Sequence, residues 1–317
     1  MLPDPGPIVD LIESFRKSKA MFAAVQMGVF EGNRDLGVEG TRLLDACVCL
    51  GLLSKDADGQ YQNTPAADEY LRRESPRTLT GYIQYSNLAL YPMWRQLEDA
   101  VKEGSNRWQQ VFGLSGGPLF SHFFETEEKK HDFLMGMHGF GQISSATLVR
   151  AFDLSRFRHA VDLGGATGHL VLAAVEAYPG MCAEVFDLPA VVEFAKQFTR
   201  GKIGLIAGDF FADPLPPADL YCLGRILHDW TEAKIRLLLG KIFAALPDGG
   251  GLLIAEKLLT PTNVSAHMQS LNMLICTEGR ERTFGEYREL LLGIGFSRVE
   301  GRISGKPVDA VLAMKSR

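Results

Sequence analysis

The chain has 317 residues, of which 46% are hydrophobic and 22% are charged, and this composition is typical of a soluble globular protein with a large core. Its 33 basic and 38 acidic residues give a net charge of −5, the wrong sign for a protein whose main partner is a nucleic-acid backbone. The five scattered cysteines fit neither a disulfide framework nor a zinc site, and the acidic, proline-containing N-terminus does not resemble a leader. We expect a cytoplasmic protein that acts on small molecules, with no nucleic-acid or membrane partner.

The first 64 residues have the pattern of helices followed by a hairpin. Apolar residues recur at helical spacing over residues 8–30, and a shorter helix is expected over residues 40–50. Residues 52–64 give two extended segments joined at Asp58-Gly59, a dipeptide that tolerates a tight turn. This order resembles a winged helix, with only a short connection at residues 30–40 where such a domain normally has another helix.

A winged helix usually binds DNA, but this one lacks the charge for it. The candidate recognition segment, residues 39–50, has one basic residue and is largely apolar, whereas phosphate contact needs clustered Lys and Arg. An apolar helical surface more often packs against another subunit, so we expect a dimerisation role.

The rest of the chain changes character near residue 150. Residues 65–150 are predicted to be mainly helical, with breaks at Pro76, Pro92 and residues 113–118. From about residue 158, short runs rich in Val, Ile and Leu alternate with helical segments, which predicts a mainly parallel sheet covered on both faces.

The last two apolar runs, residues 297–303 and 309–315, are too close for a crossover helix and are expected to form an antiparallel hairpin. We therefore predict an α/β fold with two domains, a helical one over residues 1–150 and a sheet domain over residues 151–317.

The loop after the first expected strand of the sheet, VDLGGATGHL, has the composition of a ligand-binding turn. The nicotinamide-type pattern GxGxxG fails, because its second and third positions hold Ala166 and His169. The pattern D-x-G-x-[GA]-x-G fits through Asp162, Gly164 and Gly168, and it resembles motif I of class I S-adenosylmethionine (SAM) methyltransferases. A carboxylate at Asp162 suits the methionine ammonium of SAM.

Two later strand ends also carry acids. Asp187 comes 25 positions after Asp162 (187 − 162 = 25) and is placed to accept ribose hydroxyls. Asp209 can accept from an adenine amino group, and Phe210 can cover the ring. Each is also compatible with an ordinary turn or capping residue.

His228, in the segment GRILHDW, follows the fourth expected strand, and Glu256 ends the fifth. Ligands of open α/β sheets bind at this edge of the sheet, so position favours a functional histidine over a packed one. A carboxylate from Glu256 or Glu281 can hold the proton on one ring nitrogen and leave the other nitrogen to act as general base. No metal site is expected, because the neighbours His228 and Asp229 do not easily converge on one ion.

These residues together resemble the metal-independent small-molecule O-methyltransferases, a family that includes plant caffeic acid and flavonoid methyltransferases and animal acetylserotonin O-methyltransferase. The segments GDFF, LHDW and ERT are specific to this branch, and the likeness covers nearly the whole chain. The resemblance implies that His228 is the base and that Glu256 and Glu281 orient it. It also implies a SAM site that includes Arg225, and a homodimer formed by the N-terminal domain, which roofs the pocket.

The resemblance further implies which residues meet the acceptor. The expected contacts are Asp229, Asn272, Cys276, Phe133 and Met137. Phe133 and Met137 lie four residues apart, on one helix face, and are equally compatible with core packing. Cys276 stands where the acetylserotonin branch has a polar amide, so the acceptor itself is not identified.

Other functions remain open. A nitrogen or carbon methyltransferase would share the SAM half, and a dimeric relative that only binds SAM would share the whole fold. An NAD-dependent dehydrogenase is disfavoured by the failed GxGxxG pattern.

Overall fold

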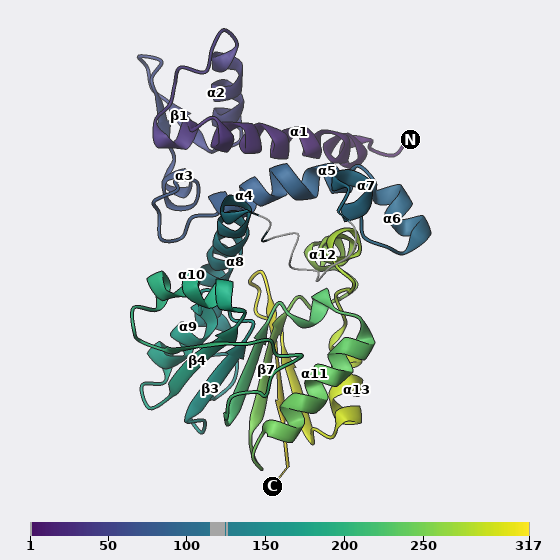
Figure 1. Ribbon diagram of the computed structural model, residues 1–317. Coiled ribbons are helices and arrows are strands. Elements are labelled where there is room, and N and C mark those ends of the chain that lie inside the picture. Colours follow the sequence, from purple (N-terminus) through teal and green to yellow (C-terminus); the bar gives the residue numbers. More distant parts are fainter. Residues whose placement is uncertain (1, 115–123, 125, 317) are drawn as a thin grey trace. The chain divides into compact units, whose positions relative to one another are not determined.

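The computed structural model describes residues 2–114, 124 and 126–316. It forms two compact units, the first made of Met1–Pro92 and Phe123–Gly139 and the second of Met93–His122 and Phe140–Arg317. Figure 1 labels the elements of both units. Each unit is described by itself below.

The first unit begins with the helices and hairpin expected from the sequence. Helix α1 (Gly6–Gln26) leads through a 3-10 turn, η1 (Val29–Glu31), to helix α2 (Gly40–Cys49). Strands β1 (Leu53–Lys55) and β2 (Tyr61–Asn63) then pair antiparallel, and Gly59 has the positive φ of 79° that the tight turn requires. Buried residues of these elements form one core, which includes Ala24, Phe30, Leu44, Cys47 and Leu53.

Short helices follow the hairpin, as predicted for residues 65–150. They are α3 (Pro65–Tyr70), α4 (Thr80–Tyr85), the π-helix η2 (Ser86–Leu90), α5 (Tyr91–Trp94), α6 (Leu97–Glu103), α7 (Trp108–Phe112) and the long α8 (Glu127–Leu148). The break expected at residues 113–118 begins at Gly113, which ends α7 with a φ of 69°, and from residue 115 it lies outside the described residues.

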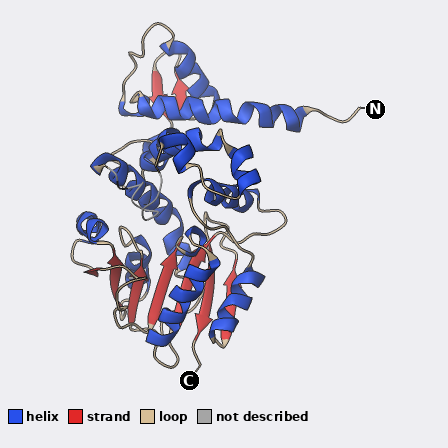
Figure 2. Ribbon diagram, turned by 45° about the vertical axis from the view of Figure 1, so that its right-hand side comes forward, coloured by secondary structure: helices blue, strands red, loops and turns tan. Residues whose placement is uncertain are grey.

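The second unit contains a seven-stranded sheet, drawn in red in Figure 2. Its strands are β3 (His159–Leu163), β4 (Cys182–Asp187), β5 (Gly204–Ala207), β6 (Leu220–Gly224), β7 (Gly251–Glu256), β8 (Arg298–Arg302) and β9 (Asp309–Met314). The spatial order is β5-β4-β3-β6-β7-β9-β8; the pairs from β5 to β7 are parallel, and β9 pairs antiparallel with β7 and β8. The predictions of a mainly parallel sheet and of a C-terminal hairpin are therefore confirmed.

Helices connect and cover these strands. They are α9 (His169–Ala177), α10 (Pro189–Thr199), α11 (Glu232–Ala245), α12 (Val264–Cys276) and α13 (Phe284–Ile294). Every residue of β7 is buried, as expected for a central strand covered on both faces. Residues Leu253 and Ala255 of β7 join the core cluster that includes Leu170 and Val171 of α9.

The strand order fixes where a ligand can bind. Strand β3 lies between β4 and β6. The chain adds β4 and β5 on one side of β3 and then adds β6 and β7 on the other side. The carboxyl ends of β3 and β6 therefore flank the switch point, where open α/β sheets bind ligands. Among the described residues, no helix has the length and apolar character needed to cross a membrane.

Candidate active site

His228 lies in a 3-10 turn, η4 (Leu227–Asp229), that follows β6. One oxygen of the Glu256 carboxylate holds this turn, because Oε1 accepts the backbone N–H groups of Ile226 at 3.0 Å and Leu227 at 2.8 Å. Glu256 is the last residue of β7, the neighbour of β6 in the sheet. Two adjacent strand ends thus fix the backbone that carries the histidine.

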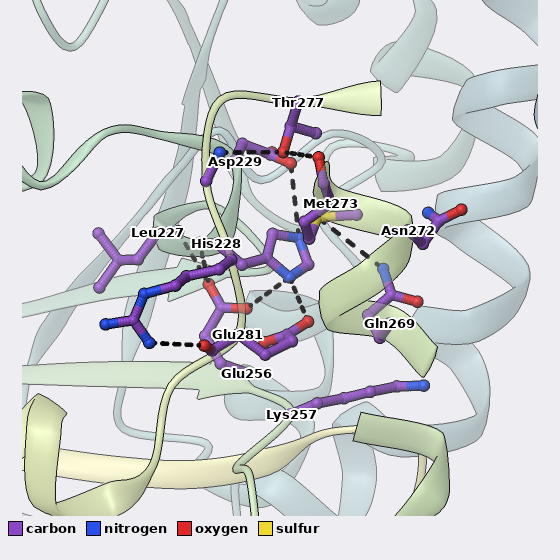
Figure 3. A network of polar contacts seen from close by, with 12 residues as sticks. Leu227, His228, Asp229, Glu256, Lys257, Gln269, Asn272, Met273, Thr277 and Glu281 are labelled. Atoms are coloured by element: carbon purple, nitrogen blue, oxygen red, sulfur yellow. Dashed lines mark hydrogen bonds and ion pairs between the residues drawn. The ribbon is translucent and has the colours of Figure 1, made fainter. Parts of the chain in front are cut away.

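Two carboxylates meet the Nδ1 atom of His228. Glu281 Oε1 lies 2.7 Å from Nδ1 and Glu256 Oε2 lies 3.1 Å from it. Figure 3 shows both acids on the same side of the imidazole ring. All three residues are at least 96% buried. A ring held in this way keeps a proton on Nδ1, which donates it to a carboxylate oxygen, and presents Nε2 as the nitrogen without a hydrogen bond to the described residues.

The other ring nitrogen has only a loose neighbour. Asp229 Oδ1 is 3.7 Å from Nε2, too far for a hydrogen bond, and no other described residue hydrogen-bonds to Nε2. This nitrogen is therefore available to accept a proton from a bound molecule.

Charge and burial act against each other in this cluster. Burial alone would lower the pKa of His228, but the nearby charges of Glu256, Glu281 and Asp229 raise it to about 10. Burial raises the pKa of Glu256 to about 7 and that of Asp229 to about 6, and the cationic imidazole opposes both shifts. The imidazole of His228 is therefore a stronger base than a free histidine, because the surrounding carboxylates stabilise its protonated form.

The backbone at Gly279 packs closely against the backbone at His228, and this contact brings Glu281, two residues later, to the histidine. A side chain on Gly279 would place its Cβ atom 2.3 Å from the carbonyl oxygen of His228, so only glycine fits there without movement. The backbone N–H of Glu278 donates to the carbonyl oxygen of Asp229 at 3.1 Å, and that of Leu259 donates to Arg282 at 2.9 Å. These contacts tie the segment after α12 to the ends of β6 and β7.

The glycine-containing loop between β3 and α9 has the geometry of a cofactor turn. Gly164 has a φ of 70° and Ala166 a φ of 49°, which is strained for a residue with a side chain. The Ala166 N–H donates to Asp187 Oδ2 at 2.9 Å, which joins the loop to the end of β4. A Cβ atom on Gly164 would lie 2.6 Å from Ile226 and 3.3 Å from the Phe210 ring, so Phe210 borders this turn. Its contact with an adenine ring stays a prediction.

Asp162 is a residue of β3, just before the loop, and it carries a buried carboxylate. It is 99% buried, and its Oδ1 atom has no hydrogen-bond partner among the described residues. Burial, reinforced by the charge of Asp187, raises its pKa well above the usual value. An unpaired buried carboxylate is costly unless a positive group neutralises it, so this position suits a ligand ammonium.

The remaining predicted cofactor residues also have local structural roles. Asp187 accepts from the backbone of Leu188 through Oδ1, and burial raises its pKa to about 6. Asp209 accepts the N–H of Phe211 at 2.8 Å, which is a turn contact. Arg225 has a positive φ of 60° and places its guanidinium 5.3 Å from the Phe140 ring centre.

Helix α12 carries the predicted acceptor contacts Asn272 and Cys276 on one face, one turn apart. Trp94 Nε1 donates to Asn272 Oδ1 at 2.9 Å, and Cys276 Sγ donates to the Asn272 carbonyl oxygen at 3.0 Å. Gln269, one turn earlier, was missed by the sequence reasoning, although its spacing from Asn272 could have indicated it. Gln269 is 92% buried, and within the described part of the chain its amide nitrogen contacts the sulfur of Met273, at 4.0 Å, and no other acceptor.

Phe133 and Met137 belong to the part of α8 in the first unit. Phe133 packs there against Tyr85, with ring centres 5.6 Å apart. Their contact with an acceptor stays a prediction.

The histidine cluster also has the atoms of a metal-ligand set, which the sequence did not anticipate. His228, Glu256 and Glu281 each offer one ligand atom, and these atoms lie within 4.8 Å of one another. The same atoms orient the imidazole, so an ion there would compete with base chemistry. The expectation of a metal-free site stays a prediction.

The sheet order and the glycine-containing loop after β3 define a class I methyltransferase fold. The model of the O-methyltransferase domain family matches residues 94–297. The chain is 41% identical to acetylserotonin O-methyltransferase of Bos taurus over 329 residues, which cover 95% of each protein. It is 38% identical to a probable bifunctional dTTP/UTP pyrophosphatase/methyltransferase protein of Homo sapiens, a match that covers 99% of this chain and 54% of that protein.

A solved structure gives the same result. The crystal structure of human N-acetylserotonin methyltransferase in complex with SAM superposes with a TM-score of 0.92 and 36% identity, and covers 98% of this chain and 97% of the other. The chain belongs to the O-methyltransferase family, as its motifs predicted.

Proposed function

We propose that the protein transfers a methyl group from SAM to a hydroxyl of a small aromatic acceptor, with His228 as the general base. The observation that carries the proposal is the asymmetry of the imidazole, whose Nδ1 is held 2.7 Å from Glu281 while Nε2 has no hydrogen bond to any described residue. Membership of the O-methyltransferase family supports the reaction class.

The cofactor site would be formed at the end of β3. The proposed residues are Asp162, Gly164, Asp187, Asp209, Phe210 and Arg225. The unpartnered Oδ1 of Asp162 fits the ammonium of SAM, and the ring of Phe210 beside Gly164 fits its adenine. When bound, SAM supplies a methyl group made electrophilic by its sulfonium. Two relatives, human N-acetylserotonin methyltransferase and PigF, were crystallised with SAM and with SAH respectively.

The base would work through the Nε2 atom of His228. The acceptor hydroxyl would give its proton to Nε2. With SAM bound, the oxygen would take up the methyl group as the carbon–sulfur bond breaks, and S-adenosylhomocysteine would leave. Glu256 and Glu281 stabilise the imidazolium that forms, because they place negative charge beside Nδ1. A positioned base of this kind contributes on the order of 10²–10⁴-fold to the rate.

The acceptor would lie against α12. Asn272 and Cys276, with Asp229 from η4, are the proposed contacts, and Gln269 adds an amide with little hydrogen bonding of its own. Phe133 and Met137 are proposed to border the same pocket. A buried amide favours acceptors that carry a second polar group over plain phenols.

The N-terminal region, residues 1–150, is proposed to form a homodimer in the cytoplasm and to roof the pocket. Helix α1 leaves large apolar side chains exposed, by 61% at Ile8, 72% at Leu11, 57% at Ile12 and 53% at Phe15. Such a stripe on a soluble chain is typical of a subunit interface. Light scattering should give a dimer mass for the protein and a monomer mass for Leu11→Asp, with Leu237→Asp on exposed α11 as the control.

The reaction itself is tested with methyl-labelled SAM and a panel of hydroxyindoles, phenols and catechols. The expected result is one product that carries the label on oxygen. Label on nitrogen or carbon would replace the proposal with another methyltransferase, and calorimetric SAM binding without any product would make the chain a non-catalytic relative. Binding of NAD in place of SAM would overturn the cofactor assignment.

A further inference from the structure

Lys257 follows Glu256 directly, at the carboxyl end of β7, and its side chain extends toward α12 (Figure 3). The ammonium donates to Ser265 Oγ at 2.8 Å, in the first turn of α12. In the described part of the chain, Ser265 is its one hydrogen-bond partner, and no carboxylate forms an ion pair with it. A lysine ammonium has three donor hydrogens, so two of them remain for a ligand.

The charge of Lys257 does not stabilise the helix that it touches. Ser265 lies near the N-terminus of α12, where the helix dipole disfavours a cation. Burial, together with the charge of Arg225, lowers the pKa of Lys257, and Glu281 and Asp309 oppose this shift without forming an ion pair with the lysine. A half-buried cation without an ion pair is unfavourable until an anion binds beside it.

Helix α12 continues from the lysine with a polar stripe. Its residues are spaced by three or four positions and so share one face of the helix; they are Ser265, Gln269, Asn272 and Cys276. The Trp94 indole can only donate, and it occupies Asn272 Oδ1, so Asn272 keeps only its amide nitrogen for a ligand. The Gln269 amide nitrogen, with only a sulfur contact at 4.0 Å, is a second donor near Lys257. This face of α12 therefore suits a group that accepts hydrogen bonds.

The sheet order separates Lys257 from the proposed cofactor site. Strand β6 lies between β7, which leads to Lys257, and β3, which leads to the glycine-containing loop. Neighbouring strands are about 4.8 Å apart, so the ends of β3 and β7 are roughly 10 Å apart. The base follows the strand between them, and Lys257 lies on the side of the base away from the loop.

We propose that Lys257 is a specificity-determining residue that binds a carboxylate of the methyl acceptor, with Gln269 as a second donor. The protein then selects hydroxylated aromatic acids over their neutral analogues. This inference deepens the proposed function and rests on it, because the acceptor hydroxyl must reach Nε2 of His228. Charge-assisted hydrogen bonds of this kind are stronger than neutral ones. They form in the ground state as well as in the transition state, so they lower KM more than they raise kcat.

The test supplies a hydroxyindole, a phenol and a catechol, each as its free carboxylic acid, its methyl ester and its carboxamide. The native protein should have a kcat/KM about tenfold or more higher for each acid than for its ester, mainly through KM. Lys257→Met should lose this preference and keep ester turnover within about twofold of the native value, which also shows that the variant is folded. Lys257→Arg should retain most of the preference, because it keeps the charge. If Lys257→Met does not fold, Lys257→Gln must give the same loss.

Lys315→Met is the matched control. Lys315 follows β9, which runs antiparallel to β7, so it lies at the opposite end of β7 from Lys257. Its ammonium donates to the carbonyl oxygens of Phe243 and Leu246 at 2.9 Å and 2.7 Å, and the acid preference should survive its loss.

Two results would overturn the proposal. One is a native protein without acid preference, or a Lys257→Met variant that keeps it. The other is a raised KM for SAM in Lys257→Met with an unchanged ratio of acid to ester, which would assign the ammonium to the carboxylate of the cofactor.

Calorimetry separates this inference from the proposed function, because binding needs no turnover. The acids and esters are titrated into the protein with S-adenosylhomocysteine bound. Acid binding that Lys257→Met abolishes, in a protein that methylates nothing, would support the lysine site and contradict methyl transfer. Methyl transfer to oxygen with equal use of acids and esters would support the proposed function and contradict the role of Lys257.

Discussion

Glu281 Oε1 lies 2.7 Å from His228 Nδ1, and both side chains are buried. The two residues are 53 positions apart in the chain and come from different connections of the sheet. Because the carboxylate accepts a hydrogen bond from Nδ1, the neutral imidazole carries its proton on Nδ1. The same hydrogen bond fixes the orientation of the ring and therefore the direction in which Nε2 points.

His228→Ala should lower kcat by about 10²–10⁴-fold, since it removes the proton acceptor. The affinity for SAM, measured by calorimetry, should stay within about twofold of the native value, because the glycine-containing loop does not include the histidine. The kcat of Glu281→Gln should lie between those of the native protein and His228→Ala, because the amide oxygen still accepts a hydrogen bond from Nδ1–H but the side chain carries no charge. A His228→Ala variant with native turnover would remove the residue from the mechanism.

The rate should rise with pH across the neutral range. His228 acts in its unprotonated form, and its pKa of about 10 means that this form increases about tenfold with each pH unit from neutrality to the pKa. The profile of kcat/KM should therefore climb toward pH 10. In Glu281→Gln the same limb should shift to lower pH, because one negative charge beside the imidazole is lost. A profile that is flat from pH 6 to 9 would contradict the raised pKa.

The ligand-free protein should lose stability as pH rises. Glu256 has a folded pKa of about 7 against an ordinary value of 4.5, so the folded state binds the proton more tightly. Its contribution is fully present below pH 4.5 and is lost as pH rises to about 7. The stability that comes from protonated His228 is likewise lost as pH rises from 6.5 to about 10, because its pKa is also raised in the folded state. Urea unfolding at several pH values should show this decline, and Glu256→Gln should flatten it between pH 4.5 and 7.

Gly279→Ala should damage both stability and turnover. The added methyl would lie 2.3 Å from the His228 carbonyl oxygen and 2.8 Å from the Trp230 backbone nitrogen, so the segment that carries Glu281 must move away. We expect a loss of about 1–3 kcal/mol in urea unfolding, together with a lower kcat. Gly240→Ala on α11, where a Cβ meets nothing within 4 Å, is the control and should be neutral or slightly stabilising. If Gly279→Ala and Gly240→Ala had the same stability and the same kcat, the backbone at Gly279 would not pack tightly against His228.

Much of the fold could be predicted because its signals are local. Most strands from β3 to β9 are short, largely apolar runs, with β8 (RVEGR) the exception, and the turn at Gly59 needs only its own dipeptide. His228 and Glu256 could be paired as well, since strands in a parallel sheet end at one edge.

The contacts that sharpen the site could not be predicted, because they join distant segments. The approach of Gly279 to His228 depends on how the segment after α12 returns to the sheet. Asp209 illustrates the same limit, since a strand-end acid at a ligand site and an acid that closes its own turn have the same sequence.

The Glu256 carboxylate holds the peptide groups of η4 with one oxygen and lies beside the imidazole with the other. The backbone conformation of η4 and the proton affinity of His228 therefore both depend on the Glu256 side chain, and a substitution of Glu256 alters both at once. Among the described residues, the Glu281 carboxylate hydrogen-bonds to the ring of His228 and to no backbone N–H of η4, so its chemistry is separable from the shape of the turn. An engineer who wishes to match this enzyme to acceptors of different acidity should vary position 281 and leave position 256 alone.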